Sequence, residues 1–406
     1  MQLVFQQFGI DEDLIKKLFL SHNHKPPSDQ MIVFNRATYF GKESEYVNEV
    51  LKNGSTQGDG NFTKLCHQLL EKKYGFLKTY LTTSCSDALE LAALLCDIKP
   101  GDEVICPSFT FVSTANAFLL RGARLVFCDS EKENPNMDVN HIEQLITNKT
   151  KAIAVMHYAG IGCNMEAIMA LAEKHNLLVV EDAAQCIDAY YHGKPLGSIG
   201  HLGAFSFHAT KNITCGEGGF ISVNDERFRM RAEIIREKGT NRASFFRGEV
   251  DKYGWVEMGS SFLPSDIVAA VLYGQLEQLS AIQQNRMNVW NQYHDAFNMF
   301  EKDAAISRMY VPENVQHNAH MYYLLFQNLE QRSSYIDYMK SHEVQCSFHY
   351  LSLHDSKFFR NQYSGGALKN SDHFSNTLVR LPLYNGLSKA EIDQVIDYTL
   401  KFYKTI

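Results

Sequence analysis

Apolar, strand-like segments alternate with amphipathic, helix-like segments between residues 78 and 182, and this alternation restricts the fold more than any other feature of the chain. The strand-like segments are 78–84, 103–108, 123–130, 151–158 and 177–182, and the helix-like segments are 84–98, 110–123, 138–146 and 164–176. Strands this apolar are typical of parallel sheets that helices cover on both faces. We therefore predict an α/β fold with a mainly parallel sheet flanked by helices.

The alternation weakens after about residue 225, which indicates a second, smaller structural unit. Residues 1–30 have the composition of an N-terminal appendage, because a short amphipathic stretch precedes a polar, proline-containing link. We predict a large domain over 31–264 and a small C-terminal α+β domain over 265–406. Expected helices in the small domain are 265–297 and 389–403, and expected strands are 321–327 and 344–350.

The composition argues against several classes of protein. The 39 Lys and Arg residues against 46 Asp and Glu give a net charge of −7, whereas a nucleic-acid-binding protein needs a basic face. No apolar run approaches the ~20 residues of a membrane-spanning helix, and the first residues lack the features of a secretory signal. The nine cysteines include no Cys-x-x-Cys pair, so we expect free thiols, a cytoplasmic location and no metal site.

Ligands of open α/β sheets bind outside the carboxyl ends of the strands, so the residues that follow each strand are site candidates. Ser84, Cys85 and Ser86 open a helix, where backbone N–H groups and the helix dipole favour a phosphate. The alternative is that Ser84 is only a helix cap. Asp182 ends a buried strand, and its carboxylate needs a partner there. That partner is either a protonated ring nitrogen or an ordinary salt bridge or helix cap.

Lys211 follows the segment FSFHAT and has few charged neighbours in the sequence. A partly desolvated lysine loses proton affinity and becomes a useful nucleophile or base, although a solvent-facing lysine in a hairpin is the alternative. A phosphate cradle, a carboxylate for a pyridine nitrogen and a lysine that bonds an aldehyde are together what pyridoxal 5′-phosphate requires. No Gly-x-Gly-x-x-Gly follows an early strand, which disfavours a Rossmann dehydrogenase.

Six spaced motifs carry a resemblance to a known family. In chain order they are QGDG, TSCSDAL, GDEVICPSFTFVSTANA, VVEDAAQ, FSFHATKN and CGEGGF. At these residues, and from about Met31 to the end, the chain resembles the DegT/DnrJ/EryC1/StrS family of pyridoxal-phosphate-dependent sugar aminotransferases. The resemblance implies the fold-type I transferase fold, pyridoxal 5′-phosphate as cofactor and a homodimer with active sites at the subunit interface.

The resemblance also implies roles for residues around the cofactor ring. Lys211 would bond covalently to the aldehyde and then carry the proton, and Asp182 would pair with the pyridine nitrogen. Gln185 would contact the 3′-oxygen of the ring, and the side chain of Phe111 would stack on the ring face. Lys211 and Asp182 are thus the expected catalytic residues.

A second group of residues would hold the phosphate of the cofactor. Ser84, Cys85, Ser86 and Ser206 are expected in one subunit, and Ser261 is expected to reach across the dimer interface. Two positions depart from the family's pattern. Many members have Gly-Thr in place of Cys85-Ser86, and many have an asparagine near Ser261. At Cys85-Ser86 the hydroxyl and the backbone amides that bind a phosphate are retained, and Ser261 can still donate a hydrogen bond in place of the asparagine.

The implied reaction moves an amino group from L-glutamate to C4 of dTDP-4-dehydro-6-deoxy-D-glucose. The products would be 2-oxoglutarate and dTDP-4-amino-4,6-dideoxy-D-galactose, for cell-surface polysaccharides such as lipopolysaccharide, O-antigen or enterobacterial common antigen. Amination to the gluco epimer (dTDP-viosamine) or at C3 remains open, as does a non-catalytic regulator that binds the cofactor or a sugar nucleotide. Dehydratases that share this scaffold replace the lysine with histidine, so Lys211 favours transamination.

A cationic cluster is the candidate site for the nucleotide diphosphate of the substrate. It consists of Arg242, Arg247, Lys252 and Tyr253. Guanidinium groups bind phosphates bidentately, although a solvated basic loop has the same composition. Two histidine pairs are interpreted as structural or substrate-edge residues rather than metal ligands, namely His317 with His320 and His349 with His354.

Overall fold

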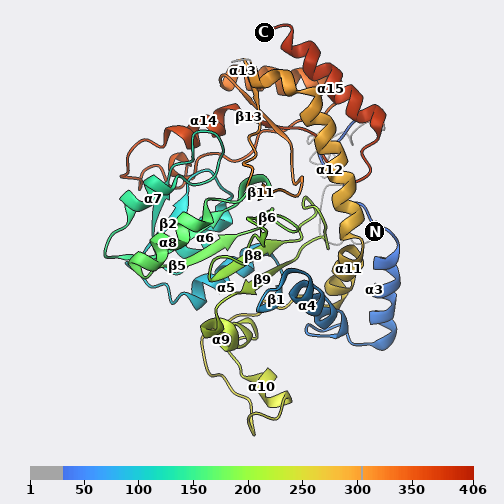
Figure 1. Cartoon of the computed structure of the whole chain (residues 1–406). Helices are drawn as coiled ribbons and strands as arrows, with labels where there is room; N and C mark the ends of the chain where they lie inside the picture. The colour runs from blue at the N-terminus through green and yellow to red at the C-terminus, as the bar shows by residue number, and fades with distance from the viewer. Residues whose placement is uncertain (1–30, 303–304) are drawn as a thin grey trace, which may run out of the picture.

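A seven-stranded sheet forms the centre of the computed structural model, which describes residues 31–302 and 305–406 (Figure 1). The strands, in their order across the sheet, are β1 (Lys78–Thr82), β9 (Gly219–Val223), β8 (Leu202–Ser206), β5 (Leu178–Asp182), β4 (Thr150–Met156), β2 (Glu103–Pro107) and β3 (Arg124–Cys128). Only β9 runs against the other strands, since it pairs antiparallel with both β1 and β8. The prediction of a mainly parallel sheet is confirmed.

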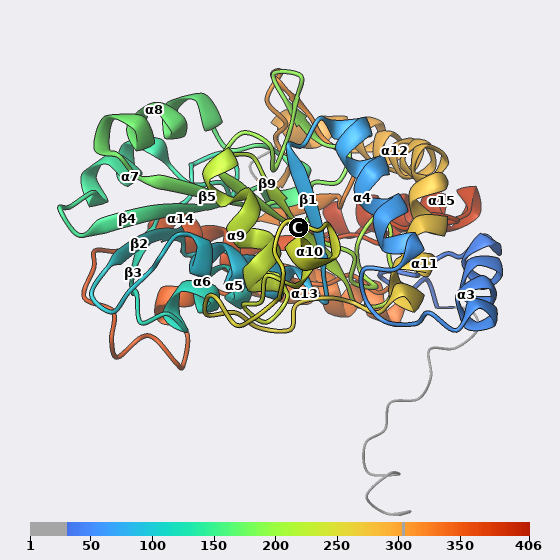
Figure 2. The same cartoon turned by 90° about the horizontal axis from the view of Figure 1, so that it is seen from below.

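Each central strand sends alternate side chains to two separate cores. Ile153 and Val155 of β4 pack into the core on one face, whereas Ala152 and Ala154 pack into the core on the other. This period of two explains why the strands are apolar throughout, because both faces are covered. Figure 2 shows α7 (Val139–Leu145) and α8 (Met165–His175) on one side of the strands, and α5 (Cys85–Leu95) and α6 (Val112–Leu119) on the other.

Four further helices complete the two layers. They are α3 (Lys42–Asn53), α4 (Asn61–Tyr74), α9 (Glu226–Arg236) and α11 (Asp266–Glu277). The glycines of QGDG allow α4 and the chain before α11 to approach closely. A Cβ on Gly58 would lie 2.8 Å from the carbonyl oxygen of Pro264, and one on Gly60 would overlap the Asp266 carboxylate. That carboxylate accepts hydrogen bonds from the backbone of Phe62 and Thr63 at the start of α4.

A second, mixed core lies towards the C-terminus. Its sheet consists of β10 (Ile306–Arg308), β12 (Tyr323–Phe326) and β13 (Leu378–Arg380), and its helices are α12 (Leu279–Ala296), α13 (Leu329–Ser341), α14 (Lys369–Thr377) and α15 (Lys389–Tyr403). Short 3-10 turns lie at Tyr158–Gly160, Asn298–Lys302 and Leu353–Asp355. The strand expected over 344–350 is wrong. Val344 pairs with Ile32 and Ser347 with Arg380, so this segment bridges two different neighbours and forms no continuous ladder.

The division of the chain into domains at 264/265 remains a prediction. The packing shows where along the chain the side chains leave one hydrophobic core and enter the next. Side chains of α11 and the first turn of α12, including Ala269, Leu276 and Ile282, belong to the core of the large sheet. From Val289 onward α12 contributes to the C-terminal core. The predicted appendage 1–30 lies outside the described residues.

Two small features project from this body. An arm, formed by residues 241–258 and containing α10 (Arg242–Phe246), extends away from the rest of the chain (Figure 1). A short sheet joins β6 (Tyr190–Tyr191), β7 (Lys194–Pro195) and β11 (Val315–Gln316). All nine cysteines are free, as expected. None of the described helices has the length and apolar character needed to cross a membrane.

Candidate active site

A cavity of about 540 Å³ opens at the carboxyl edge of the large sheet, where β1, β5 and β8 end. Seven of the predicted cofactor residues line it, namely Ser84, Cys85, Ser86, Phe111, Asp182, Ser206 and Lys211. These residues come from four connections that are far apart in the sequence. Their meeting follows from the topology, because parallel strands bring their carboxyl ends to one edge.

The N-terminus of α5 forms one end of this pocket. The Ser84 hydroxyl accepts a hydrogen bond from the Asp87 backbone N–H at 3.1 Å, so the helix-cap interpretation of Ser84 is correct. The Ser86 hydroxyl lies 2.6 Å from that of Ser113 and also lines the pocket. Gly219 lies directly against this turn, since a Cβ there would be 2.6 Å from the Cys85 backbone nitrogen. The turn presents unpaired N–H groups and a hydroxyl, which suits a phosphate.

Asp182 occupies the end of β5, and its side chain is buried. The Thr114 hydroxyl donates to its Oδ2 at 2.6 Å, and the Ala184 backbone N–H donates to its Oδ1 at 3.1 Å. Burial raises the pKa of Asp182, while these hydrogen bonds and the charge of Lys211 act in the opposite direction. No described cation lies within ion-pair distance of Asp182, so its buried carboxylate has no direct partner of opposite charge in the pocket that Lys211 also lines.

Lys211 lies in the connection between β8 and β9 and is half-buried beside the pocket. Its backbone is held by a hydrogen bond from the Lys211 N–H to the His208 carbonyl oxygen at 2.9 Å. Burial lowers the pKa of Lys211, so its amine loses the proton more readily than a lysine in water. A neutral amine is the form that attacks an aldehyde.

The other two residues expected around the cofactor ring, Gln185 and Phe111, both lie near Tyr350. The sequence did not single out Tyr350. The Gln185 side-chain oxygen accepts from the Ala159 backbone N–H at 2.6 Å, and its amide donates to the Tyr350 hydroxyl at 3.0 Å. Gln185 lines a small cavity that adjoins the main pocket at Lys211. The ring of Phe111 is 53% exposed and lies 6.2 Å from that of Tyr350, so one of its faces is available for stacking.

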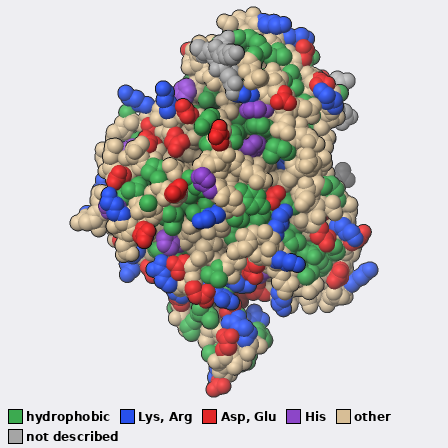
Figure 3. Space-filling model, in the orientation of Figure 1, with side chains coloured by type: hydrophobic (Ala, Val, Ile, Leu, Met, Phe, Trp, Pro, Cys, Tyr) green, Lys and Arg blue, Asp and Glu red, His purple; other side chains and the backbone are tan. Residues whose placement is uncertain are grey.

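The structure does not bring the cationic cluster into this pocket. Arg242, Arg247, Lys252 and Tyr253 all lie on the arm, and Figure 3 shows side chains of both charges there. Arg247 already forms ion pairs with two carboxylates, those of Glu233 and Glu249. Ser261 is exposed at the base of the arm, where it pairs with Glu237. Within one chain, therefore, these five residues lie apart from the pocket.

A buried pair beneath the pocket was also missed by sequence reasoning. His157 and Glu181 have no exposed side-chain surface, and the imidazole Nε2 lies 2.8 Å from the carboxylate. The His157 Nδ1 accepts the Cys163 backbone N–H at 3.1 Å, so its single proton is on Nε2 and points at Glu181. The pair fixes the end of β5 immediately before Asp182. Ser113 and Thr114 were missed too, and their places two and three positions after Phe111 were the only available signal.

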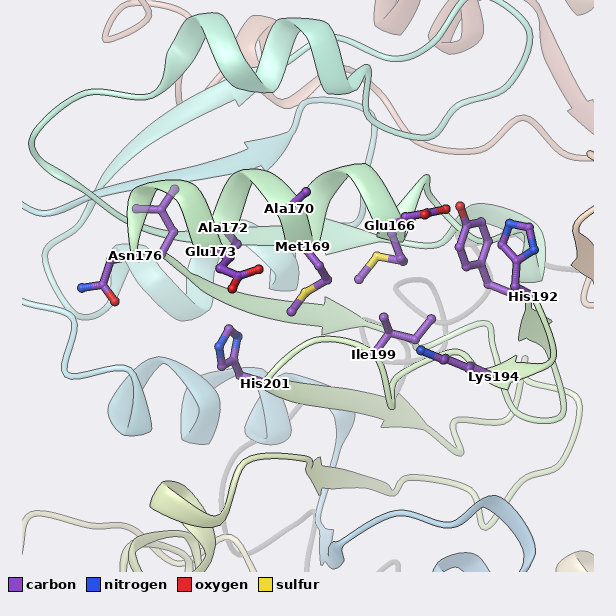
Figure 4. A pocket seen from close by; sticks show the side chains of 13 residues that line it. Glu166, Met169, Ala170, Ala172, Glu173, Asn176, His192, Lys194, Ile199 and His201 are labelled. Carbon is purple, nitrogen blue, oxygen red and sulfur yellow. The ribbon is translucent and has the colours of Figure 1, made fainter.

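A larger cavity of about 820 Å³ lies away from these residues, between α8 and the β6–β7 hairpin (Figure 4). Glu166, Glu173, His192, Lys194 and His201 line it, but none of the predicted site residues does. It shows neither an unpaired buried carboxylate nor a buried lysine amine. Size alone therefore does not identify the site.

The histidines outside the pocket have structural partners. His317 packs against the ring of Trp290, and the His354 Nδ1 lies 2.7 Å from the Ser108 hydroxyl. His349, by contrast, lines the pocket. Among residues 31–302 and 305–406, no three His, Cys, Asp or Glu side chains are grouped as a metal site requires.

Comparisons with known proteins agree with this chemistry. A model of the DegT/DnrJ/EryC1/StrS aminotransferase family matches residues 40–399. The spore coat polysaccharide biosynthesis protein SpsC of Bacillus subtilis is 32% identical over 343 residues, which cover 81% of this chain and 87% of that protein. The UDP-4-amino-4-deoxy-L-arabinose–oxoglutarate aminotransferase of Shewanella sediminis is 29% identical over 384 residues, covering 91% of this chain and 97% of that protein.

Solved structures show the same fold with the cofactor in two forms. The PMP form of Spr1654 from Streptococcus pneumoniae is 26% identical, with a TM-score of 0.85, and the match covers 92% of this chain and 99% of that one. The PLP form of the same protein is 25% identical, with a TM-score of 0.84 and coverage of 93% and 100%. The helix N-terminus, the unpaired carboxylate and the half-buried lysine amine of this pocket fit that cofactor. This chain therefore belongs to the DegT/DnrJ/EryC1/StrS aminotransferase family, whose members depend on pyridoxal 5′-phosphate.

Proposed function

We propose that this aminotransferase transfers the amino group of L-glutamate to C4 of dTDP-4-dehydro-6-deoxy-D-glucose and forms dTDP-4-amino-4,6-dideoxy-D-galactose. The single observation that carries the proposal is the juxtaposition of Lys211 and Asp182 in one pocket at the carboxyl edge of the sheet. Relatives named for spore coat polysaccharide biosynthesis and for amination of a nucleotide-linked sugar support a sugar substrate. The product would serve the synthesis of cell-surface polysaccharides.

Each pocket residue has a distinct task in this proposal. When bound, the cofactor supplies a ring that accepts electrons from the carbon losing its proton. The Lys211 amine removes the proton from the α-carbon of the donor and later returns one to the sugar. Asp182 holds a proton on the ring nitrogen, and Phe111 covers one ring face. Ser86 and Ser206, together with the N–H groups at the start of α5, bind the phosphate.

A homodimer is part of the same proposal. Large apolar side chains remain exposed near the pocket and on the arm, including Phe111, Phe246, Trp255 and Met258. Exposed apolar surface of this kind marks a protein interface. In a symmetric dimer the arm of one subunit reaches the pocket of its partner, so that Arg242, Lys252 and Ser261 contribute there. The buried free thiols fit a reducing compartment, and we place the enzyme in the cytoplasm.

The decisive experiment incubates the purified enzyme with L-glutamate and dTDP-4-dehydro-6-deoxyglucose and determines the product by NMR. An axial amine at C4 is the expected result. An equatorial amine would identify the gluco epimer, amination elsewhere would identify a C3 enzyme, and loss of a hydroxyl would identify a dehydratase. The Lys211→Ala variant is the control, because removing the amine should abolish turnover while the fold is retained. Glutamate-dependent amination by that variant would contradict the assigned base.

A regulator that binds the cofactor without catalysis is the second candidate. Retention of both Lys211 and Asp182 in one pocket counts against it, since simple binding does not need an amine of lowered pKa beside an unpaired carboxylate. Binding of the sugar nucleotide without any change of the cofactor on addition of glutamate would favour the regulator.

A further inference from the structure

A small polar cavity of about 50 Å³ lies behind Lys211 and adjoins the main pocket. Lys211 lines both spaces, so its side chain stands between them. No hydrogen bond joins the Lys211 amine to any residue of 31–302 or 305–406. By this measure one water molecule needs ~10–15 Å³, so the cavity has room for about three or four waters. On this side, the amine can be held only by a group in the cavity wall, directly or through water.

His320 forms part of this wall, and its backbone is fixed by neighbouring segments. The buried guanidinium of Arg286, on α12, donates to the His320 carbonyl oxygen at 2.7 Å and to the Ala319 carbonyl oxygen at 3.2 Å. The His320 backbone N–H donates to the Asn318 side-chain oxygen at 3.1 Å. The imidazole is therefore carried by a rigid segment.

The tautomer of His320 follows from its neighbour Asn212. The Asn212 amide nitrogen donates to the Asn318 backbone carbonyl oxygen at 2.8 Å and to the Gln283 side-chain oxygen at 2.9 Å. A backbone carbonyl can only accept, so the amide has one orientation and Asn212 Oδ1 faces His320. His320 Nδ1 lies 2.8 Å from that oxygen and therefore carries a proton. Burial and the charge of Lys211 hold the pKa of His320 well below the usual value of 6.5, so the ring is neutral and Nε2 has a free lone pair.

This lone pair is an unused acceptor in the cavity wall, since Nε2 has no partner among the described residues. The other polar groups of the wall are less suitable. The side chain of Arg380 has only donors. The Gln185 side-chain oxygen already accepts a backbone N–H at 2.6 Å, and the Thr210 hydroxyl lies 2.9 Å from an imidazole nitrogen. His349 Nδ1 lies 2.7 Å from a tyrosine hydroxyl, which can donate or accept, so no tautomer of His349 is fixed.

We propose that His320 is a positioning residue whose Nε2 accepts a hydrogen bond from the Lys211 amine through water in the cavity. The inference rests on the role proposed for Lys211 in transamination. The Lys211 amine is released whenever a substrate amine takes its place, and it then has to stay beside the carbon that loses or gains a proton. An acceptor behind the amine keeps it there. His320 acts only through Lys211 and remains neutral.

This hydrogen bond should raise the pKa of Lys211. A charged ammonium has three donors and no acceptor, so an acceptor beside it favours the protonated form. Loss of the acceptor should therefore lower the pKa of Lys211 by about one unit, which is a tenfold change in proton affinity. The other titratable and charged groups around the two residues stay in place in the variants described below. They are Cys85 of α5, Asp182 of β5, Cys186, Arg286 of α12, His349 and Arg380 of β13.

Two substitutions separate this role from a purely structural role of His320. In His320→Asn the side-chain amide replaces Nδ1 and can still donate to Asn212, but the acceptor at Nε2 is lost. In His320→Gln an amide oxygen lies near the place of Nε2, but the hydrogen bond to Asn212 is lost. We expect His320→Asn to keep its urea midpoint and to lower the pKa of Lys211 by about one unit. His320→Gln should have a lower urea midpoint and keep the pKa of Lys211 within about 0.3 unit.

The pKa of Lys211 is measured in the apoenzyme as the pH dependence of labelling by dinitrofluorobenzene, with mass spectrometry of the peptide that contains Lys211. Asn35→Ala is the matched control, because Asn35 lines the same cavity and donates to the Ala209 carbonyl oxygen at 3.0 Å. This variant enlarges the cavity but leaves His320 Nε2 in place, so the pKa should stay within about 0.3 unit. An unchanged pKa in His320→Asn, an equal decrease in Asn35→Ala, or a pKa that falls in step with the urea midpoint would overturn the inference.

The cofactor-loaded enzyme gives a second readout. Lys211 would act in both halves of the reaction, so His320→Asn should slow the conversion of the PLP form by L-glutamate and the amination of the sugar by the PMP form, each about tenfold. The KM for glutamate should change less than about twofold, because His320 does not bind the donor. A loss confined to one half, or a change in KM alone, would contradict a role through Lys211.

The two measurements also separate this inference from the proposed function. If glutamate fails to change the cofactor of the normal enzyme while His320→Asn still lowers the pKa of Lys211, the proposed function fails and the hydrogen bond from Lys211 to His320 stands. If glutamate reacts normally and the pKa of Lys211 is the same in His320→Asn and the normal enzyme, the positioning role fails and the proposed function stands.

Discussion

Replacement of Glu181 by glutamine tests whether the buried pair beneath the pocket determines the stability of the sheet edge. The carboxylate is fully buried, and four donors meet it. The backbone N–H groups of Ile199 and Gly200 donate to its Oε1, and the Gly197 N–H, at 2.7 Å, and the His157 Nε2–H donate to its Oε2. Both oxygens are thus surrounded by donors alone.

The expected loss follows from counting those donors. Glutamine keeps one oxygen, but its NH2 group must face the other two donors, which then lose their acceptor. His157 cannot adapt by moving its proton to Nδ1, because Nδ1 accepts the Cys163 N–H. A buried donor without a partner costs ~1–3 kcal/mol. Two such donors therefore predict a decrease of about 4 kcal/mol in the free energy of unfolding.

Urea unfolding followed by circular dichroism measures this change. The urea concentration at the midpoint should fall, while the dependence of the unfolding free energy on urea concentration stays constant. Glu103→Gln is the control, since Glu103 is also buried but its carboxylate meets a rotatable Thr147 hydroxyl at 2.6 Å and the Arg124 guanidinium at 3.5 Å. We expect a loss below ~1 kcal/mol there. If Glu181→Gln is no less stable than Glu103→Gln, the donor count does not govern stability at this site.

Three further results are expected. Asp182→Asn should lower the single-turnover rate about a hundredfold or more, because the ring loses the carboxylate that holds its proton; a near-normal rate would show that another group protonates the ring. The reaction of apoenzyme with pyridoxal 5′-phosphate should accelerate with pH and level off below 10.5, because burial lowers the pKa of Lys211 and the amine is fully neutral above that pKa; a rate still rising at pH 10.5 would contradict this. Asp59→Ala should destabilise the protein by ~3 kcal/mol, since both Asp59 oxygens bind the buried Arg236 guanidinium at 2.6 and 2.8 Å. The double variant Asp59→Ala/Arg236→Met should recover part of that loss. Equal urea midpoints for Asp59→Ala and the unmodified protein would show that Asp59 does not stabilise the buried Arg236.

The alternating part of the fold was predictable because its signal is local. The segments expected at 103–108, 151–158 and 177–182 are β2, β4 and β5, since a strand covered on both faces needs apolar residues throughout. The helix over 389–403 was predicted with its ends, and a capping box at Ser388 and Glu391 explains its sharp start. The segment 344–350 has an apolar pattern too, but its backbone partners come from opposite ends of the chain, which local sequence does not encode.

The site was predictable only where a residue directly follows a strand. Asp182 and Ser86 were found in this way, and the low charge around Lys211 indicated the third element. Thr114, which hydrogen-bonds Asp182, is 68 positions away from it, and Tyr350 is 165 positions from Gln185. Such contacts depend on how the two cores meet.

The cavity behind Lys211 joins the beginning of the described chain to its last strand, since Phe34 and Asn35 line it together with Arg380. A nascent chain that has emerged only as far as β9 already carries Lys211 and Asp182, yet it lacks Tyr350 and Arg380. This wall of the cavity can therefore form only when synthesis is almost complete. Premature termination anywhere before β13 would leave a polypeptide in which this cavity is incomplete.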